Sequence, residues 1–150
     1  MKAIEIIDLT KKYKEFYALN KLNLSVEKGE IFGFLGPNGA GKSTLIRIIS
    51  TLSNPSSGDA KVLNLSIKKH KKEIRKLIGV ALQDSSLDPL QTGEELLKFH
   101  SNLNSIKKSE IKNKVENILK ILDLTEAKNN LIKTYSGGMR RKLDIAASLL

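Results

Sequence analysis

Cysteine is absent from this sequence, aromatic residues make up only 5% of it, and long hydrophobic runs are missing. Without cysteine there is no disulfide, no thiolate metal ligand and no cysteine nucleophile, which suits a reducing compartment. The scarcity of aromatics leaves no interleaved stacking platform for single-stranded nucleic acid. No apolar run approaches the roughly 20 residues that cross a bilayer, and acidic residues interrupt the N-terminal apolar stretch, which is not typical of a signal peptide. We therefore expect any membrane role to depend on a partner.

Positive charge is present in excess, with 26 Lys and Arg against 16 Asp and Glu and a net charge of +10. Such a surplus is compatible with nucleic acid, with anionic lipid or with a lysine-rich proteome. Its densest part, residues 68–76, contains one acid and leads into the apolar residues 77–80. We interpret this part as a solvated helix or loop that precedes a buried strand.

Short strand patterns alternate with helical patterns along the 150 residues, which predicts one α/β domain, and we expect this domain to be incomplete. Residues 31–35 form a continuous apolar run, typical of a strand buried on both faces. A turn is expected at Lys28 and Gly29. The predicted strands are residues 3–9, 22–26, 31–35, 59–63 and 77–82.

Four helical segments are expected after the first strands. One begins at Ser43 and buries Leu45, Ile46, Ile48, Ile49 and Leu52. Thr92 and Glu95 form a capping-box signature for the next, which carries Leu96, Leu97, Phe99 and Leu103. A helical block continues with the stripe Ile111, Val115, Ile118, Leu119 and Leu122. The last segment has its stripe at Met139, Leu143, Ala146, Ala147 and Leu150 and has no helix-ending signal, so we expect the sequence to stop within a helix and to be truncated.

A glycine-rich segment between a predicted buried strand and a predicted helix fits the pattern G-x-x-x-x-G-K-[ST]. Its alternative interpretation is an ordinary glycine turn. Glycines allow successive backbone N–H groups to point at a phosphate, and the following helix adds its positive N-terminal end. We expect ATP to contact this loop and the next residue: Gly36, Pro37, Asn38, Gly39, Ala40, Gly41, Lys42, Ser43 and Thr44. Lys42 is expected at the β- and γ-phosphates, and the Ser43 hydroxyl on Mg²⁺.

Further along, residues 135–139 read Tyr-Ser-Gly-Gly-Met, and a glutamine, Gln83, follows the strand pattern of residues 78–82. With the phosphate loop, these features resemble the ATP-binding-cassette (ABC) family, and residues 135–146 are similar to the form found in drug-resistance exporters of the daunorubicin type. The resemblance covers essentially the whole chain. It implies a P-loop NTPase fold with a RecA-like core sheet, N-terminal antiparallel strands and a helical subdomain, with the C-terminal part missing.

The resemblance also implies residue roles. In the family the signature serine and second glycine touch the γ-phosphate held by a second subunit in a head-to-tail dimer, and Ser136 and Gly138 match these positions. A capped helix start is the alternative for Ser136. Gln83 matches the glutamine that reaches Mg²⁺ and the attacking water, although it could be a surface residue. Tyr13 resembles the aromatic that stacks on adenine, with Phe16 and Tyr17 as competitors.

Two departures from the family pattern affect the expected activity. Met139 replaces the usual glutamine of the signature, which fits the exporter branch. The family's Mg²⁺ aspartate, catalytic glutamate and later histidine do not occur in these residues, and His70 and His100 lie too early to be that histidine. We therefore expect the 150-residue chain to bind nucleotide weakly and to hydrolyse it barely or not at all.

The resemblance implies a core of about residues 1–90, a helical subdomain of about 91–136 and the start of the signature helix at 136–150. It implies a peripheral ATPase at the cytoplasmic face of the membrane that drives an exporter, with a transmembrane permease and a second nucleotide-binding domain as partners. No nucleic-acid partner is expected. The alternatives are a cassette ATPase acting on the ribosome or nucleic acid, and an unrelated P-loop kinase or GTPase, which would leave residues 136–138 without a role.

Overall fold

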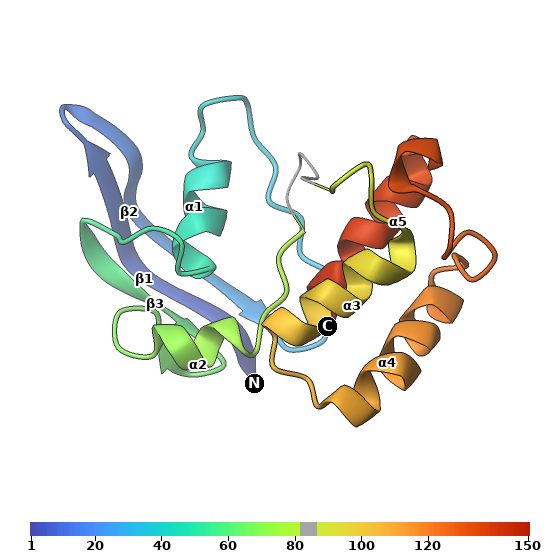
Figure 1. Cartoon of the computed structure of the whole chain (residues 1–150). Helices are drawn as coiled ribbons and strands as arrows, with labels where there is room; N and C mark the ends of the chain where they lie inside the picture. Colours follow the sequence, from blue (N-terminus) through green and yellow to red (C-terminus); the bar gives the residue numbers. More distant parts are fainter. Residues whose placement is uncertain (82–86) are drawn as a thin grey trace. The chain divides into compact units, whose positions relative to one another are not determined.

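The computed structural model describes residues 1–81 and 87–150 and divides them into two compact units, Met1–Ile78 and Gly79–Leu150. Each unit has its own hydrophobic core. The elements follow one another along the chain as coloured in Figure 1. They are β1 (Lys2–Tyr13), β2 (Phe16–Glu27), α1 (Lys42–Ile49), β3 (Ser57–Val62), β4 (Leu65–Ser66), α2 (Lys71–Arg75), α3 (Gly93–Leu103), α4 (Lys108–Ile121), the 3₁₀ turn Ile132–Thr134 and α5 (Gly137–Ser148).

The first unit is built on a four-stranded antiparallel sheet in the order β2-β1-β3-β4. Ile6 on β1 pairs with Leu24 on one side and with Ala60 on the other, and Ile6 and Ala60 are both buried. Alternation of apolar and polar residues explains this arrangement, because successive side chains of a strand point to opposite faces. The strands predicted at residues 3–9, 22–26 and 59–63 are confirmed, and the first two are longer than predicted.

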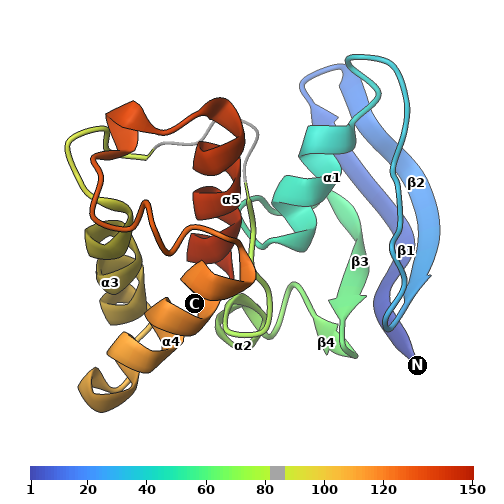
Figure 2. The same cartoon turned by 90° about the vertical axis from the view of Figure 1, so that its right-hand side faces the viewer.

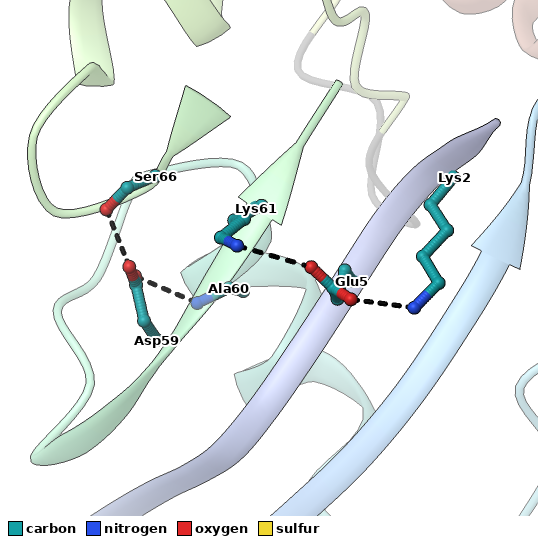
Figure 3. A network of polar contacts seen from close by, with 6 residues as sticks. All are labelled: Lys2, Glu5, Asp59, Ala60, Lys61 and Ser66. Carbon is teal, nitrogen blue, oxygen red and sulfur yellow. Dashed lines mark hydrogen bonds and ion pairs between the residues drawn. The ribbon is translucent and has the colours of Figure 1, made fainter. Parts of the chain in front are cut away.

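The polar side chains of β1 and β3 form a network across the sheet (Figure 3). Glu5 accepts a hydrogen bond from Lys2 Nζ at 2.7 Å and one from Lys61 Nζ at 3.4 Å, so it joins β1 to β3. The hydrogen bond from Lys2 is the main cause that lowers the pKa of Glu5. Asp59 similarly accepts from the Ser66 hydroxyl at 2.7 Å and joins β3 to β4. These contacts link neighbouring strands on the polar face of the sheet.

Helix α1 packs against the sheet through Leu45 and Ile48, which are 2% and 0% exposed (Figure 1). Its predicted apolar stripe extends too far. The helix ends at Ile49, so Leu52 lies beyond it and is 64% exposed, and Ile46 is also exposed. Helix α2 buries Ile74 in the same core and leaves most of the basic residues around it exposed, as expected for a solvated helix.

Two predicted strands of the first half of the chain are not formed. Residues 31–35 contain no strand, and Ile31 and Leu35 are 100% and 92% exposed. Residues 77–81 form no strand either, and Leu82 lies outside the described residues. An apolar run becomes a buried strand only where neighbouring strands supply hydrogen bonds and cover both faces. Within the described residues no strand pairs with either run, and every paired strand is antiparallel.

The second unit is helical, and α3, α4 and α5 contribute to one core (Figure 2). Ile111, Val115 and Leu119 of α4 are buried as predicted. The stripe of α5 is confirmed at Leu143, Ala146 and Ala147, although the helix ends at Ser148 instead of running through the last residue. On α3 the prediction holds for Leu96 and Leu97 and is wrong for Phe99 and Leu103, which are 53% and 64% exposed. Among the described helices, none has the length and apolar character needed to cross a membrane.

Candidate functional site

The loop before α1 reaches the helix through two glycines in the left-handed region. Gly39 and Gly41 both have φ of 86°, a conformation that other residues adopt at a cost. Gly41 is the N-cap of α1, and its carbonyl accepts the N–H of Leu45 at 2.8 Å. Since glycine has no side chain, no side-chain hydrogen bond caps this helix. The sequence thus builds a sharp entry into α1 and leaves its N-terminus uncapped.

Gly41 is also required by a close approach between the loop and the sheet. A Cβ atom placed on Gly41 would overlap the backbone carbonyl of Ala18 and crowd the side chain of Leu19 on β2. Backbone atoms cannot move aside as a flexible side chain can. The loop is therefore held against β2 at a point where only glycine fits.

Lys42 places its charge within the loop. Its Nζ donates to the carbonyl oxygens of Gly36 and Pro37, each at 2.6 Å. Both acceptors are neutral, so the ammonium keeps its full positive charge. Among the ion pairs of the described residues, none includes Lys42. The lysine is thus held beside the loop by contacts that an incoming phosphate can replace.

Backbone donors of the loop and of the first turn of α1 are also open. Within the described residues, the N–H groups of Gly39, Gly41, Lys42, Ser43 and Thr44 have no hydrogen-bond partner, whereas that of Ala40 donates to Pro37 at 3.2 Å. No acidic residue occupies the first turn of α1. Free N–H groups and the positive end of the helix dipole together favour an anion. The donor set therefore fits a phosphate group.

The aromatic residues near the end of the β1–β2 hairpin lie in the same unit as the loop. Tyr13 pairs with Phe16 and is 48% exposed, and Tyr17 is 50% exposed. Tyr17 is the residue before Ala18, which the loop approaches at Gly41, so the end of the hairpin and the loop lie at one end of the unit (Figures 1 and 2). The ammonium of Lys11 lies 5.0 Å from the centre of the Tyr13 ring. The predicted adenine-stacking residue is therefore accessible, and so are its two competitors.

Ser136 and Gly138 begin α5 in the second unit. Ser136 is the N-cap, and its hydroxyl accepts the N–H of Met139 at 3.2 Å. Ser136, Gly137 and Gly138 are exposed, and a Cβ on Gly137 would meet no atom within 4 Å. The first turn of α5 also contains no acidic residue. This helix start is capped yet open to solvent.

Tyr135, the first residue of the signature string, has a structural role that the sequence did not predict. It is 3% exposed, and its hydroxyl donates to the carbonyl of Ala127 at 2.7 Å. A Cβ on Gly93 would overlap the Tyr135 hydroxyl, so a larger residue at the start of α3 would require the buried tyrosine side chain to move. Burial raises the pKa of Tyr135, and the backbone of Gly93 opposes part of this effect. No local pattern in the sequence indicates this long-range contact.

The described residues offer few ligands for a metal ion beyond Ser43. Gln83, the other predicted Mg²⁺ ligand, lies outside the described residues. Among residues 1–81 and 87–150, no group of three or more His, Cys, Asp and Glu is placed to hold a metal. The exposed Ser43 hydroxyl, next to the open N–H groups, fits a Mg²⁺ ion whose other ligands are phosphate oxygens and water.

Known proteins resemble this chain in sequence and in fold. The family model described as ABC transporter matches residues 19–150. The daunorubicin/doxorubicin resistance ATP-binding protein DrrA of Streptomyces peucetius is 40% identical over 149 residues, which cover 99% of this chain and 45% of that protein. The chain thus spans about half the length of this relative.

Two solved structures match nearly the whole chain. The cbiO1 protein of Clostridium perfringens, part of an ABC transporter complex, matches with 27% identity and a TM-score of 0.88, over 99% of this chain and 61% of that one. An ATP-binding cassette solved as a dimer in a post-hydrolysis state with ADP and Pi matches with 28% identity and a TM-score of 0.80. The match covers 97% of this chain and 68% of that one. The family model covers most of the chain, the fold matches that of known cassettes, and the chain belongs to the ABC transporter family.

Proposed function

We propose that this chain binds ATP with Mg²⁺ at residues 36–44. The observation that carries the proposal is the uncapped N-terminus of α1, where free backbone N–H groups lie beside the Lys42 ammonium. A triphosphate carries charge and acceptor oxygens, and both complement this donor set. The adenine would stack on Tyr13, with Phe16 and Tyr17 as alternatives.

Each loop residue has a distinct task in this proposal. Gly36 to Gly41 shape the backbone so that its N–H groups face the phosphates. When ATP binds, Lys42 Nζ breaks its hydrogen bonds to the carbonyl oxygens of Gly36 and Pro37 and donates to the β- and γ-phosphates instead. The Ser43 hydroxyl binds Mg²⁺, whose charge neutralises the phosphate oxygens when bound. The chain's contribution is positioning and charge complementarity, which are the main requirements of phosphoryl transfer.

For the whole protein we propose an ATPase subunit of an exporter, located at the cytoplasmic face of a membrane and working with a transmembrane permease. The name of the Streptomyces relative supports a drug-resistance role and does not support the ribosomal alternative. We further propose that Ser136 and Gly138 of a second copy cover the γ-phosphate and that Gln83 contacts the metal and the attacking water. The dimeric cassette solved with ADP and Pi supports such a pairing. The core, helical subdomain and signature helix would form one ABC domain.

The Lys42→Ala variant tests the nucleotide site directly. Loss of the Lys42 ammonium removes two charge-assisted contacts to phosphate, each worth roughly 1.5 to 3 kcal/mol. The Kd for Mg-ATP should therefore rise at least tenfold. The measurement is titration calorimetry with Mg-ATP. Lys28→Ala is the matched control, because Lys28 is an exposed lysine in the turn after β2 and lies outside the loop.

An unchanged Kd for Lys42→Ala, or an equal loss in the Lys28→Ala control, would refute the proposed site. Retained folding of both variants, checked by circular dichroism, keeps the comparison valid.

A further inference from the structure

The positive charge of this protein is concentrated in one unit and in one segment of it. Residues 1–78 carry 15 Lys and Arg against 7 Asp and Glu, whereas residues 79–150 carry 11 against 9. Residues 68–76, called the basic segment below, hold six of those cations and one acid, Glu73. The proposed nucleotide site uses none of these six, so their function is open.

The basic segment is fixed to the core. Ile67 and Ile74 are 2% and 0% exposed and belong to the hydrophobic core of the first unit. The N–H of Ile74 donates to the carbonyl of His70 at 3.0 Å, which joins the turn to α2. Because these two isoleucines are buried, the neighbouring lysines lie on the outside, and Lys68, Lys69, Lys72 and Lys76 are exposed.

None of the six cations is neutralised within the described residues. No ion pair there includes a residue of the basic segment. Arg75 donates to the hydroxyl and the carbonyl of Thr51 at 2.7 and 3.1 Å, and Lys71 donates to the side chain of Asn54 at 2.5 Å. These acceptors are neutral, so Arg75 and Lys71 keep their charge while they fix the turn of residues 51–54 beside α2.

Exposed leucines accompany this charge. Leu52, in the turn that Arg75 and Lys71 hold, is 64% exposed, and Leu77, directly after the basic segment, is 53% exposed. Cations next to exposed apolar side chains are typical of surfaces that bind the headgroup region of a membrane. A nucleic acid would attract the lysines but gives the leucines no apolar partner. The only ring in the segment is His70, so a stacking surface is also missing there.

We propose that the basic segment, with Leu52 and Leu77, docks on a surface of anionic phospholipid. Lys68, Lys69, Lys72 and Lys76 contact the headgroups, and the two leucines enter the boundary between headgroups and acyl chains. This contact with the membrane does not depend on the nucleotide site, because the four exposed lysines are not part of that site.

Co-sedimentation with phosphatidylcholine vesicles, with and without phosphatidylserine, tests the proposal. The protein should bind the vesicles with phosphatidylserine and bind pure phosphatidylcholine much more weakly. Each lysine near an anionic surface contributes a factor of about five. The combined variant Lys68→Gln, Lys69→Gln, Lys72→Gln and Lys76→Gln should therefore bind at least about a hundredfold more weakly.

A matched control changes the same charge in the other unit, through Lys107→Gln, Lys108→Gln, Lys112→Gln and Lys120→Gln, all at exposed positions. The control should bind the phosphatidylserine vesicles nearly as well as the unmodified protein. Lys→Arg at the four sites of the basic segment keeps the charge and should retain binding. The variant Leu52→Ser with Leu77→Ser should weaken vesicle binding several-fold and leave binding to a single-stranded RNA unchanged.

Three outcomes would overturn the proposal: equal binding to both kinds of vesicle, an equal loss in the control on α4, or tighter binding to RNA than to the vesicles through the same lysines. The affinity of the Lys→Gln variant for Mg-ATP should stay unchanged. Failure of this proposal is thus distinguishable from failure of the nucleotide site.

Discussion

The N-termini of α1 and α3 use the same backbone groups in opposite ways. Helix α3 satisfies N–H groups at its N-terminus with side chains of its own. The Thr92 hydroxyl accepts the N–H of Glu95 at 3.2 Å, and the Glu95 carboxylate accepts the N–H of Thr92 at 2.8 Å. Glu94 and Glu95 also place negative charge in its first turn. Helix α1 begins at a glycine, has no side-chain cap and has no acid in its first turn. The satisfied cap and the two acids of α3 oppose an anion at that end, whereas α1 keeps open N–H groups and no opposing charge.

An acid in the first turn of α1 would remove the difference between the two helix starts, and we expect it to change the affinity for Mg-ATP more than any other variant below. In Ser43→Asp the carboxylate would lie at the position proposed for phosphate and metal, and like charges about 4 Å apart repel strongly. We expect the Kd for Mg-ATP to rise about a hundredfold, while the free chain becomes slightly more stable because the acid favours the helix dipole. Fluorescence titration and urea unfolding measure the two effects, with Ser43→Ala as control. Loss of affinity no greater than in Ser43→Ala would contradict the account.

Gly41→Ala tests the glycine cap of α1. Alanine at φ of 86° is strained, and its Cβ would also overlap the carbonyl of Ala18. The two costs together should lower the free energy of unfolding by about 2 kcal/mol or more. Gly39→Ala is a matched control with the same φ and no atom within 4 Å of the added Cβ. It should cost only about 1 kcal/mol in urea unfolding. Equal losses would show that the loop is not held against β2.

The local features of this fold were predictable from the sequence, and the features that depend on distant partners were not. The helix after the glycine-rich loop and the capping box at Thr92 and Glu95 each depend on a few neighbouring residues, and both form as expected. The apolar run of residues 31–35 was predicted as a buried strand and is exposed, because burial depends on strands elsewhere in the chain. The structural role of Tyr135 was not predicted for the same reason, since Gly93, which it packs against, is remote in sequence.

Thr92→Ala should remove the cap of α3 with a moderate effect. Loss of a threonine N-cap typically costs about 1 kcal/mol of stability. The free energy of unfolding in urea should fall by this amount, and the Kd for Mg-ATP should not change, because α3 does not contribute to the proposed site. Ser136→Ala provides a comparison at the cap of α5 and should destabilise by a similar amount. A changed Kd in Thr92→Ala would mean that α3 contributes to the nucleotide site.

The smallest effect concerns the pH dependence of the α3 cap. The backbone hydrogen bond from Thr92 is the main cause that lowers the pKa of Glu95 below its ordinary value of 4.5. A carboxyl with a lowered pKa stabilises the folded state fully above its unfolded pKa, and this contribution disappears as pH falls through the folded pKa. The stability difference between the unmodified protein and Glu95→Gln should therefore be largest near neutral pH and shrink below about pH 4. Urea midpoints across this range measure it, and a constant difference would contradict the assignment.

Backbone amide shifts by NMR on addition of Mg-ATP test the central claim most directly, because they report the open N–H groups of α1 one by one. We predict large shifts at Gly39, Gly41, Lys42, Ser43 and Thr44 and none at residues 93–96 of α3. Unshifted loop amides at saturating nucleotide, or equal shifts at both helix starts, would contradict the account.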